Sequence, residues 1–245
     1  MKNWMFRIAL LLVVASALAY TAHYFIFHDV HHIFIYMLGD IGFLFLDVLL
    51  VLLIIERLLA RKEKKSILQK LNMVIGTFFS EVGMELLRHF SDFVENSEQL
   101  EHDVLINPKW NKKNFHDARS KAIAFRYSIV FDVDKLEKFR DFLKSNHSFL
   151  VRLLENPILL ENQRFTDLLW AVFHLSEELN FRDSLHNLPD TDIAHLKGDL
   201  QRAYSSIVSE WIAYTEHLKS TYPFLFSLAA RINPLNPSAS PIVQE

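Results

Sequence analysis

Two carboxylates, Asp40 and Asp47, lie inside a stretch of the sequence that is otherwise almost entirely apolar. The stretch extends from Ile33 to Ile55, which is long enough for one helix to cross the hydrocarbon core of a bilayer. An ionised carboxylate near the middle of such a helix costs about 2.5–3.5 kcal/mol on insertion scales. Because the two carboxylates are seven residues apart, they share one helix face. This face is expected either to line a cation or proton pathway or to contact neighbouring helices inside the membrane.

A second apolar stretch, Ile8–Phe27, precedes the first and has a polar face of its own. If the two stretches form a hairpin closed around residues 29–31, the Tyr20 hydroxyl lies level with Asp40 and is expected to donate to it. No polar side chain of the same hairpin reaches Asp47, so its partner must come from another copy of the chain. We therefore expect a homo-oligomer. The residues predicted to form the intramembrane polar contacts or ion pathway are Ser16, Tyr20, Tyr36, Asp40 and Asp47.

The charges around the hairpin predict its orientation. Lys2 and Arg7 precede the first apolar stretch, and the sequence ERLLARKEKK follows the second, whereas the connecting sequence HDVHH contains no Lys or Arg. The positive-inside rule therefore places both termini in the cytoplasm of a prokaryotic cell and residues 28–32 outside its plasma membrane. An alternative is that ASALA, at 15–19, is the cleavage site of a signal peptide. Cleavage would still leave the second span and the rest of the chain in place.

Histidines near the connection form the first group of candidate metal ligands. Imidazole nitrogen binds zinc and copper, and several copies of the loop could converge in an oligomer. The alternative is that these histidines are only polar residues at the membrane interface and bind no metal ion. The candidate ligands in this region are His23, His28, His31 and His32.

A second group of candidate ligands, Glu81, Glu85 and His89, is spaced at four-residue intervals and is expected to line one helix face. His174 also precedes Glu177 and Glu178, Glu210 and His217 lie two turns apart, and an Asp-x-x-His spacing occurs at 183–186 and at 192–195. The di-iron spacing, in which His follows Glu by three residues, is absent from the sequence. Solvated helix faces explain these groups without a metal ion, and a helix cap explains the acidic residues near 190–192.

Composition narrows the classes of function. The chain has no cysteine, which excludes disulfides, thiolate metal sites and cysteine catalysis. Residues 66–245 have a net charge of −5, and a net negative charge does not favour nucleic-acid binding. No phosphate-binding glycine loop or hydrolase elbow motif occurs, so we expect a protein that is not an enzyme and has no cofactor.

The 245-residue sequence predicts an all-α protein in four parts: a transmembrane hairpin, a helical stalk, an antiparallel cytoplasmic helical bundle and a flexible tail. Helices of the bundle are expected near 114–130, 163–181 and 192–219. A further helix is expected to start at Asp134, as N-cap, and to end at the ENP sequence of residues 155–157. The boundaries of the four parts are 1–60 (spans at about 8–27 and 33–55), 61–95, 96–232 and 233–245.

The function expected from this organisation is to tether an interaction or assembly module to the membrane. The expected partners are the lipid bilayer, other copies of the chain and a cytoplasmic protein. One alternative is a small oligomeric channel for cations or protons, which rests on Asp40 and Asp47. A second alternative is a metalloprotein with its metal in the helical bundle.

Overall fold

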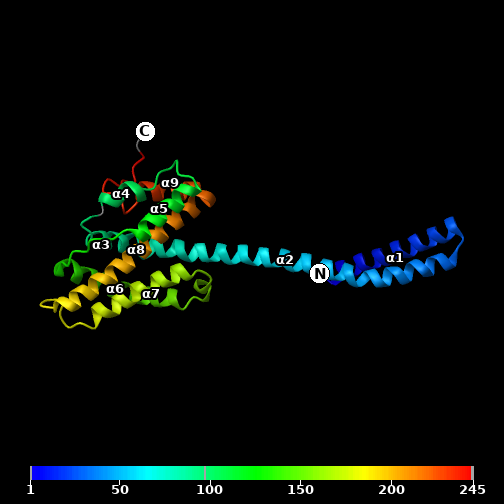
Figure 1. Ribbon diagram of the computed structural model, residues 1–245, viewed down its shortest axis with the longest axis horizontal. Coiled ribbons are helices and arrows are strands. Elements are labelled where there is room, and N and C mark those ends of the chain that lie inside the picture. Colours follow the sequence, from blue (N-terminus) through cyan, green and yellow to red (C-terminus); the bar gives the residue numbers. More distant parts are fainter. Residues whose placement is uncertain (1, 97, 244–245) are drawn as a thin grey trace. The chain divides into compact units, whose positions relative to one another are not determined.

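The computed structural model describes residues 2–96 and 98–243, and these residues form an all-helical protein (Figure 1). The predicted all-α fold is confirmed. Among the described residues there is no β-strand, although Val94 and Ile129 form an isolated antiparallel bridge. In chain order the helices are α1 (Lys2–Phe27), α2 (Val30–Phe78), the π-helix η1 (Phe79–Gly83), α3 (Met84–Ser91), α4 (Glu98–Val104), α5 (Lys112–Ala124), α6 (Val133–Leu154), the 3-10 helix η2 (Pro157–Glu161), α7 (Gln163–Asn180), α8 (Asp190–Thr221) and α9 (Pro223–Arg231).

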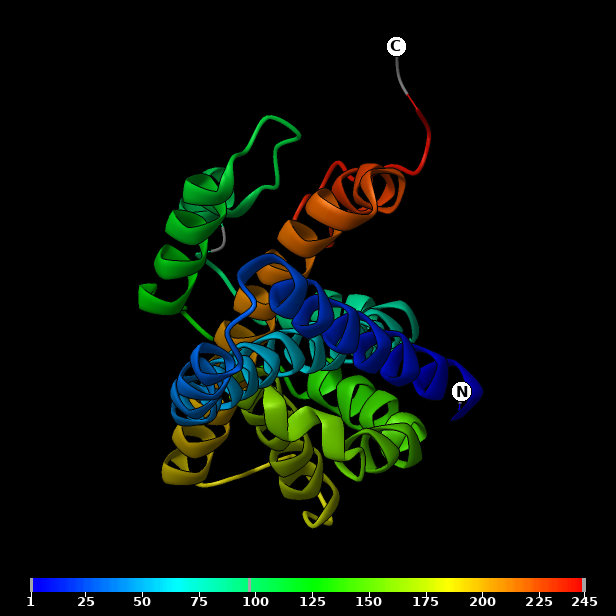
Figure 2. The ribbon, with the colours of Figure 1, turned by 90° about the vertical axis from the view of Figure 1, so that its right-hand side faces the viewer.

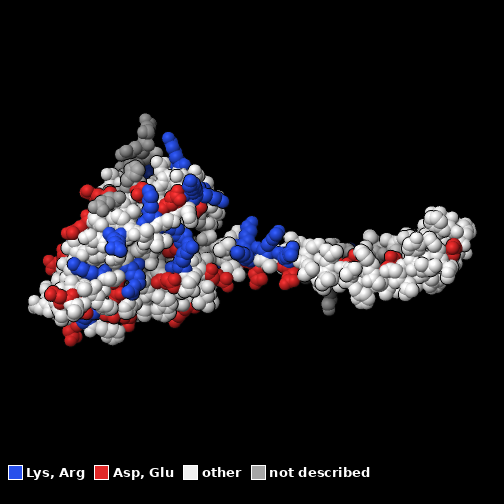
Figure 3. All heavy atoms as spheres, viewed as in Figure 1, with Lys and Arg blue, Asp and Glu red and all other residues white. Residues whose placement is uncertain are grey.

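The chain divides into two compact units, Met1–Lys64 (unit 1) and Lys65–Glu245 (unit 2). Unit 1 consists of α1 and the first part of α2. By length and composition, these two helices are apolar enough to cross a membrane, and none of the residues in their most apolar windows is buried. From Ile8 to Ile55 the charged side chains are three aspartates, so the surface of this stretch is almost uncharged (Figure 3).

The connection between α1 and α2 consists of His28 and Asp29. His28 adopts a left-handed backbone conformation with φ of 51°, which allows the chain to reverse its direction within two residues. The Asp29 carboxylate accepts a hydrogen bond from the backbone N–H of His32 at 3.2 Å and so caps the first turn of α2. This short reversal brings the rings of His23 and His32 into stacked contact, with 5.8 Å between their centroids.

A π-helical turn, η1, separates α2 from α3. Its last residue, Gly83, has ordinary helical angles, but a Cβ atom at this position would lie 2.7 Å from the ring of Phe79 and 2.8 Å from the ring of Phe78. Both rings are fully buried, so they have little room to move away. Glycine is therefore required at this position by close packing and not by an unusual backbone conformation.

Helix α8, 32 residues long, is the central element of unit 2 (Figure 2). It packs against α3, α5, α7 and α9, and α7 also packs against α6. Its buried residues follow a helical period, and aromatic rings from distant parts of the sequence meet beside it. The ring of Phe79 stacks on that of Tyr214 and contacts that of Trp211, each at 5.2 Å between centroids. These contacts fix the end of the α2 region within the core of unit 2.

Asparagine and aspartate side chains set where the helices of unit 2 begin. Asn111 forms a reciprocal capping box with Asn114 at the start of α5. The cap of α6 is Asp132, which accepts from the backbone N–H of Lys135 at 3.1 Å, so the predicted cap at Asp134 is wrong. The extended backbone ends at Asp132, which leaves Asp134 inside the first turn.

Two segments that were expected to lie outside the bundle have buried residues. In the expected stalk, 61–95, side chains become buried from Leu71 onward and belong to the core of unit 2. In the expected tail, 233–245, Asn233 is 1% exposed and accepts a hydrogen bond from the indole N–H of Trp211 at 2.9 Å. This bond and the burial of Leu235 attach the beginning of the segment to α8.

Candidate functional site

The two aspartates of the apolar stretch lie on α2 and are exposed. Among the described residues, neither Asp40 nor Asp47 has a hydrogen-bond or ion-pair partner. The predicted donation from Tyr20 to Asp40 is not formed. The connection is centred on residues 28 and 29, earlier than the assumed 29–31, so Tyr20 lies opposite the turn that precedes Asp40. Tyr20 instead borders a hollow of about 410 Å³ together with Tyr36, His23 and His32.

The histidines near the connection are only partly brought together. His32 contacts both the ring of His23 and, edge-on at 4.5 Å, the ring of Tyr36. His28 lies next to Tyr24, and His31 is exposed. Ser16, on α1, is exposed as well. Within the described part of one chain, the imidazole nitrogens of this region do not converge on a common point with a third ligand.

The predicted row Glu81, Glu85 and His89 is interrupted by the π-helix. Glu81 lies within η1, whereas Glu85 and His89 belong to α3. A π-turn contains one residue more than an α-turn, so Glu81 and Glu85 do not stack one above the other as they would on a regular α-helix. The ring of His89 packs on Phe142 at 4.8 Å between centroids. The structure does not gather these three side chains into a ligand set.

A different group of side chains meets between α7 and α8. His174 and Glu178 are one turn apart on α7, and His195 and Asp199 are one turn apart on α8. The Nε2 atoms of both histidines lie 3.4 Å from Asp199 Oδ2 and 3.7 Å from Glu178 Oε1. The ligand atoms of His174, Glu178 and His195 all lie within 4.8 Å of one another. This group, His174, Glu178, His195 and Asp199, is called the α7–α8 cluster below, and it combines two imidazole nitrogens with two carboxylate oxygens.

Arginines surround the cluster. Arg182 donates from one nitrogen to Glu178 Oε2 at 2.6 Å and from two others to both oxygens of Asp192, at 2.6 and 2.9 Å. These hydrogen bonds from Arg182 lower the pKa of the Glu178 and Asp192 carboxyl groups and raise that of the guanidinium. On α8, Arg202 lies 3.1 Å from Asp199 Oδ1. Each carboxylate of the cluster therefore contacts an arginine through the oxygen that faces away from the histidines.

A second polar contact, between α5 and α8, joins Arg119 to the buried Glu210 at 2.5 Å. Burial raises the pKa of Glu210, and the nearby Arg119 acts in the opposite direction. Arg119 also donates to the Ser209 hydroxyl at 3.0 Å. Because these groups satisfy one another, the contact fastens two helices and offers no ligand atom to a further molecule.

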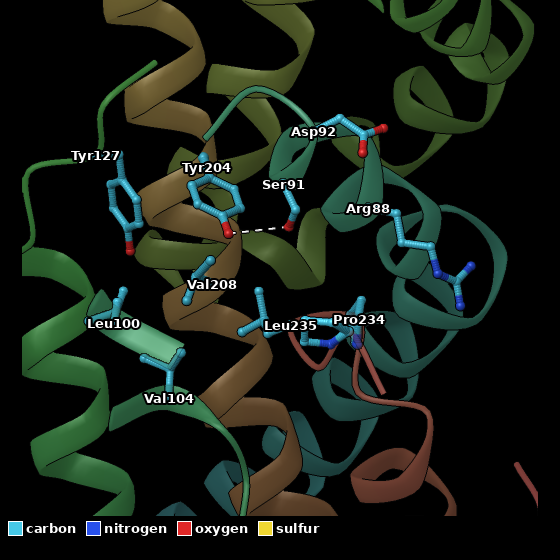
Figure 4. A pocket seen from close by; sticks show the side chains of 11 residues that line it. Arg88, Ser91, Asp92, Leu100, Val104, Tyr127, Tyr204, Val208, Pro234 and Leu235 are labelled. Atoms are coloured by element: carbon cyan, nitrogen blue, oxygen red, sulfur yellow. Dashed lines mark hydrogen bonds between the residues drawn. The ribbon is translucent and has the colours of Figure 1, made fainter. Parts of the chain in front are cut away.

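A hollow of about 440 Å³ lies between α3, α4, α8 and the segment after α9 (Figure 4). Its walls are mostly apolar. The Ser91 and Tyr204 hydroxyls on its surface lie 3.2 Å apart, and the Tyr127 hydroxyl donates a hydrogen bond to the backbone carbonyl of Ala122. Burial raises the pKa of Tyr127 far above its usual range. The tyrosines thus serve local packing and make this hollow a weaker candidate than the α7–α8 cluster.

Comparisons with known proteins match nearly the whole chain. Residues 67–231 match a family model described as "Uncharacterized protein MJ1433, C-terminal helical domain", and residues 1–59 match one described as "MJ1433, N-terminal helical domain". The chain belongs to the MJ1433 family. It is 43% identical over 247 aligned residues to the protein named "Uncharacterized protein MJ1433" of Methanocaldococcus jannaschii, an alignment that covers 100% of this chain and 98% of that protein. No solved structure matches the chain.

The two MJ1433 family models divide the chain where the structure does. One model ends at residue 59 and the other begins at residue 67, and the boundary between the two units, after Lys64, lies in this interval. The apolar stretches of α1 and α2 therefore fall in the N-terminal family model, and the α7–α8 cluster falls in the C-terminal one.

The α7–α8 cluster was missed by the sequence analysis, although its signal is present in the sequence. His-x-x-x-Glu occurs at 174–178 and His-x-x-x-Asp at 195–199, and this spacing places both side chains of each pair on one helix face. His174 was predicted as a candidate with its acidic neighbours, and His195 with Asp192, whereas Asp199 was not among the predicted residues. Two such pairs on consecutive helices that a short loop connects are the pattern that could have identified the group.

Proposed function

We propose that this protein is an integral membrane protein in which unit 1 spans the bilayer as a two-helix hairpin and tethers unit 2 to its cytoplasmic face. The observation that supports this proposal is the apolar surface of α1 and of the first part of α2. Large side chains remain exposed along both helices, among them Leu38 at 73% and Phe45 at 72%. A continuous apolar surface of this size requires a cover in water, and lipid provides it.

The dimensions fit this role. The candidate span Phe6–Phe27 has 22 residues, which extend about 33 Å as a helix and match a hydrocarbon core of about 30 Å. In the sequence, basic residues flank the hairpin on both sides, with Lys2 and Arg7 before it and five Lys/Arg between Arg57 and Lys65. The positive-inside rule then places both termini and unit 2 on the cytoplasmic side of a prokaryotic plasma membrane.

The hairpin further indicates assembly with other copies. Asp47 lies near the middle of the second span and has no partner among the described residues of its own chain. Isolated in lipid, it would cost about 2.5–3.5 kcal/mol on insertion scales. Contact with the hairpins of other copies removes this cost, so the proposed role of unit 1 is both anchoring and homo-oligomer formation. Unit 2 is the module that the assembly presents to a cytoplasmic partner.

The second candidate function is a cation or proton channel. It is favoured by one observation: Asp40 and Asp47 share a face of α2, so an oligomer that turns this face inward would present two rings of carboxylates along its axis. The tethering function and the channel make the same prediction for topology. The two functions differ in whether the ring of Asp47 carboxylates in the oligomer is accessible to water.

Single cysteines test the topology, because the natural chain has none. His31→Cys is suitable for the outer end, since His31 is exposed whereas Asp29 caps α2. In intact cells a membrane-impermeant maleimide should label His31→Cys and should label Ser240→Cys only after permeabilisation. Labelling of Ser240→Cys in intact cells, or release of the protein from membranes by alkaline carbonate, would refute the proposal.

A further inference from the structure

The nitrogen and oxygen atoms of the α7–α8 cluster lie at separations close to those of a zinc site. Zinc is held at about 2.0–2.2 Å by nitrogen and oxygen ligands, so neighbouring ligand atoms of an ideal tetrahedron lie about 3.3–3.6 Å apart. The four distances between the histidine nitrogens and the carboxylate oxygens are 3.4, 3.4, 3.7 and 3.7 Å. The ligand atoms of His174, Glu178 and His195 all lie within 4.8 Å of one another, and Asp199 lies beside both histidines.

Asp199 supplies an independent observation that points to a ligand. Its side chain is 1% exposed, and its Oδ2 atom accepts no hydrogen bond from any described residue. A buried carboxylate oxygen without a partner is costly and is rare in folded proteins. Both neighbouring atoms, at 3.4 Å, are the Nε2 atoms of His174 and His195. One cation bound between the two helices would satisfy this oxygen together with both nitrogens.

The surroundings orient the ligands. In metal sites, second contacts of the ligating side chains fix their direction and are worth about 10–100-fold in affinity. Glu178 turns Oε1 to the cluster and receives Arg182 on Oε2, and Asp199 turns Oδ2 to the cluster and faces Arg202 with Oδ1. The same division of the two oxygens thus occurs on both helices. It leaves one oxygen of each carboxylate directed at the common point.

We propose that His174, Glu178, His195 and Asp199 bind one divalent transition-metal ion of the zinc class. Two carboxylates balance the charge of a divalent ion, and two imidazole nitrogens disfavour Mg²⁺ and Ca²⁺, which prefer oxygen ligands. Zn²⁺ and Co²⁺ accept four nitrogen and oxygen ligands in a tetrahedron, which is the geometry that we expect once the ion is bound. The histidines are about half exposed, at 47% and 50% of their side chains, so the ion has direct access from solvent.

The ion joins α7 to α8 on both sides of the loop at 181–189. Arg182 already links the end of α7 to the beginning of α8, through Glu178 and Asp192, and the ion adds a further link between the two packed helices. Metal binding therefore stabilises this pair of helices, and the stability of unit 2 should depend on the concentration of free metal.

Titration of the metal-free, full-length chain with Co²⁺ in detergent micelles tests the site. Tetrahedral Co²⁺ absorbs visible light much more strongly than octahedral Co²⁺, so the spectrum reports both binding and geometry. We expect one tetrahedral Co²⁺ per chain, displaced by one equivalent of Zn²⁺, and a higher melting temperature with Zn²⁺. Asp199→Asn and His195→Gln should each weaken binding by more than about 100-fold, and Arg182→Gln by about 10–100-fold.

Matched controls are His186→Gln and Glu177→Gln, which change a nearby exposed histidine and the neighbour of Glu178 and should keep binding within about twofold of the natural chain. If Asp199→Asn fails to fold, His195→Gln decides, because its side chain is half exposed. The proposal is overturned if Co²⁺ gives only the weak octahedral spectrum, or if tetrahedral binding survives Asp199→Asn and His195→Gln. Binding that disappears only when His28 and His31 are replaced would place the ion in unit 1 and would equally overturn it.

Discussion

Replacement of Gly83 by alanine tests the packing around the π-helix. In an ordinary exposed helix, glycine to alanine stabilises a protein by about 0.5–1 kcal/mol. At Gly83 the new methyl group would lie 2.7–2.8 Å from the buried rings of Phe79 and Phe78, about 1 Å closer than carbon atoms normally approach. Overpacking of a core costs about 1–3 kcal/mol, so at the middle of both ranges the net effect of Gly83→Ala is a loss of about 1.3 kcal/mol.

The matched control is Gly198, also helical, which has open space around the position of a Cβ atom. Gly198→Ala should gain about 0.5–1 kcal/mol, so the same substitution has opposite signs at the two sites. For a chain of this length, 1 kcal/mol corresponds to about 2–4 °C in melting temperature. Thermal melts of the full chain in detergent with a chelator, followed by circular dichroism, should show a fall of about 3–5 °C for Gly83→Ala and a rise for Gly198→Ala. A rise for both would refute the close approach of the rings.

Three further predictions concern polar groups. Arg119→Ala leaves Glu210 buried without its partner and should lower the free energy of unfolding by about 3 kcal/mol. Burial raises the pKa of Glu210 and Arg119 counteracts this effect, so the carboxyl takes up a proton more readily in the variant. The loss in melting temperature should therefore be smaller at pH 5 than at pH 8. Trp211→Phe removes the donor to Asn233 and leaves a buried amide oxygen with one bond fewer, so a denaturant titration should show a loss of about 1–3 kcal/mol. Asp47→Asn should keep the oligomer mass in native mass spectrometry, whereas Asp47→Leu should weaken assembly. A change of cation flux in liposomes for the Asn variant would favour the channel. Unchanged mass and unchanged flux in both variants would leave Asp47 without either role.

The helices were predictable because their signals are local. Apolar stretches without breakers gave the two long helices, and helical periods bounded by polar turns gave α7 at 163–181, where the structure has Gln163–Asn180. The start of α6 was placed two residues late, at Asp134. Asp132 and Asp134 both have side chains that can cap a helix, and only the point at which the extended backbone ends distinguishes them.

The polar contacts were less predictable because each depends on a small geometric detail. The pairing of Tyr20 with Asp40 required a connection one or two residues later than His28 and Asp29, and no propensity rule fixes the left-handed conformation of His28. The row from Glu81 to His89 assumed an unbroken α-helix, and the π-turn that interrupts it lies where the rings of Phe78 and Phe79 pack closely against Gly83. Such packing belongs to the tertiary structure.

The difference between the α7–α8 cluster and the aspartates of α2 lies in what one chain can supply. At the cluster, two helices that one loop connects bring the ligand atoms of His174, Glu178 and His195 within 4.8 Å of one another, with Asp199 beside both histidines, so the proposed site lies within one chain. Asp47 has no partner in its own chain, and any role for it requires other copies. Monomers in detergent should therefore bind metal at the cluster as tightly as the assembled protein does, whereas every consequence of Asp47 should vanish when the oligomer dissociates. Metal affinity that falls on dissociation would mean that the cluster, too, depends on contacts between copies.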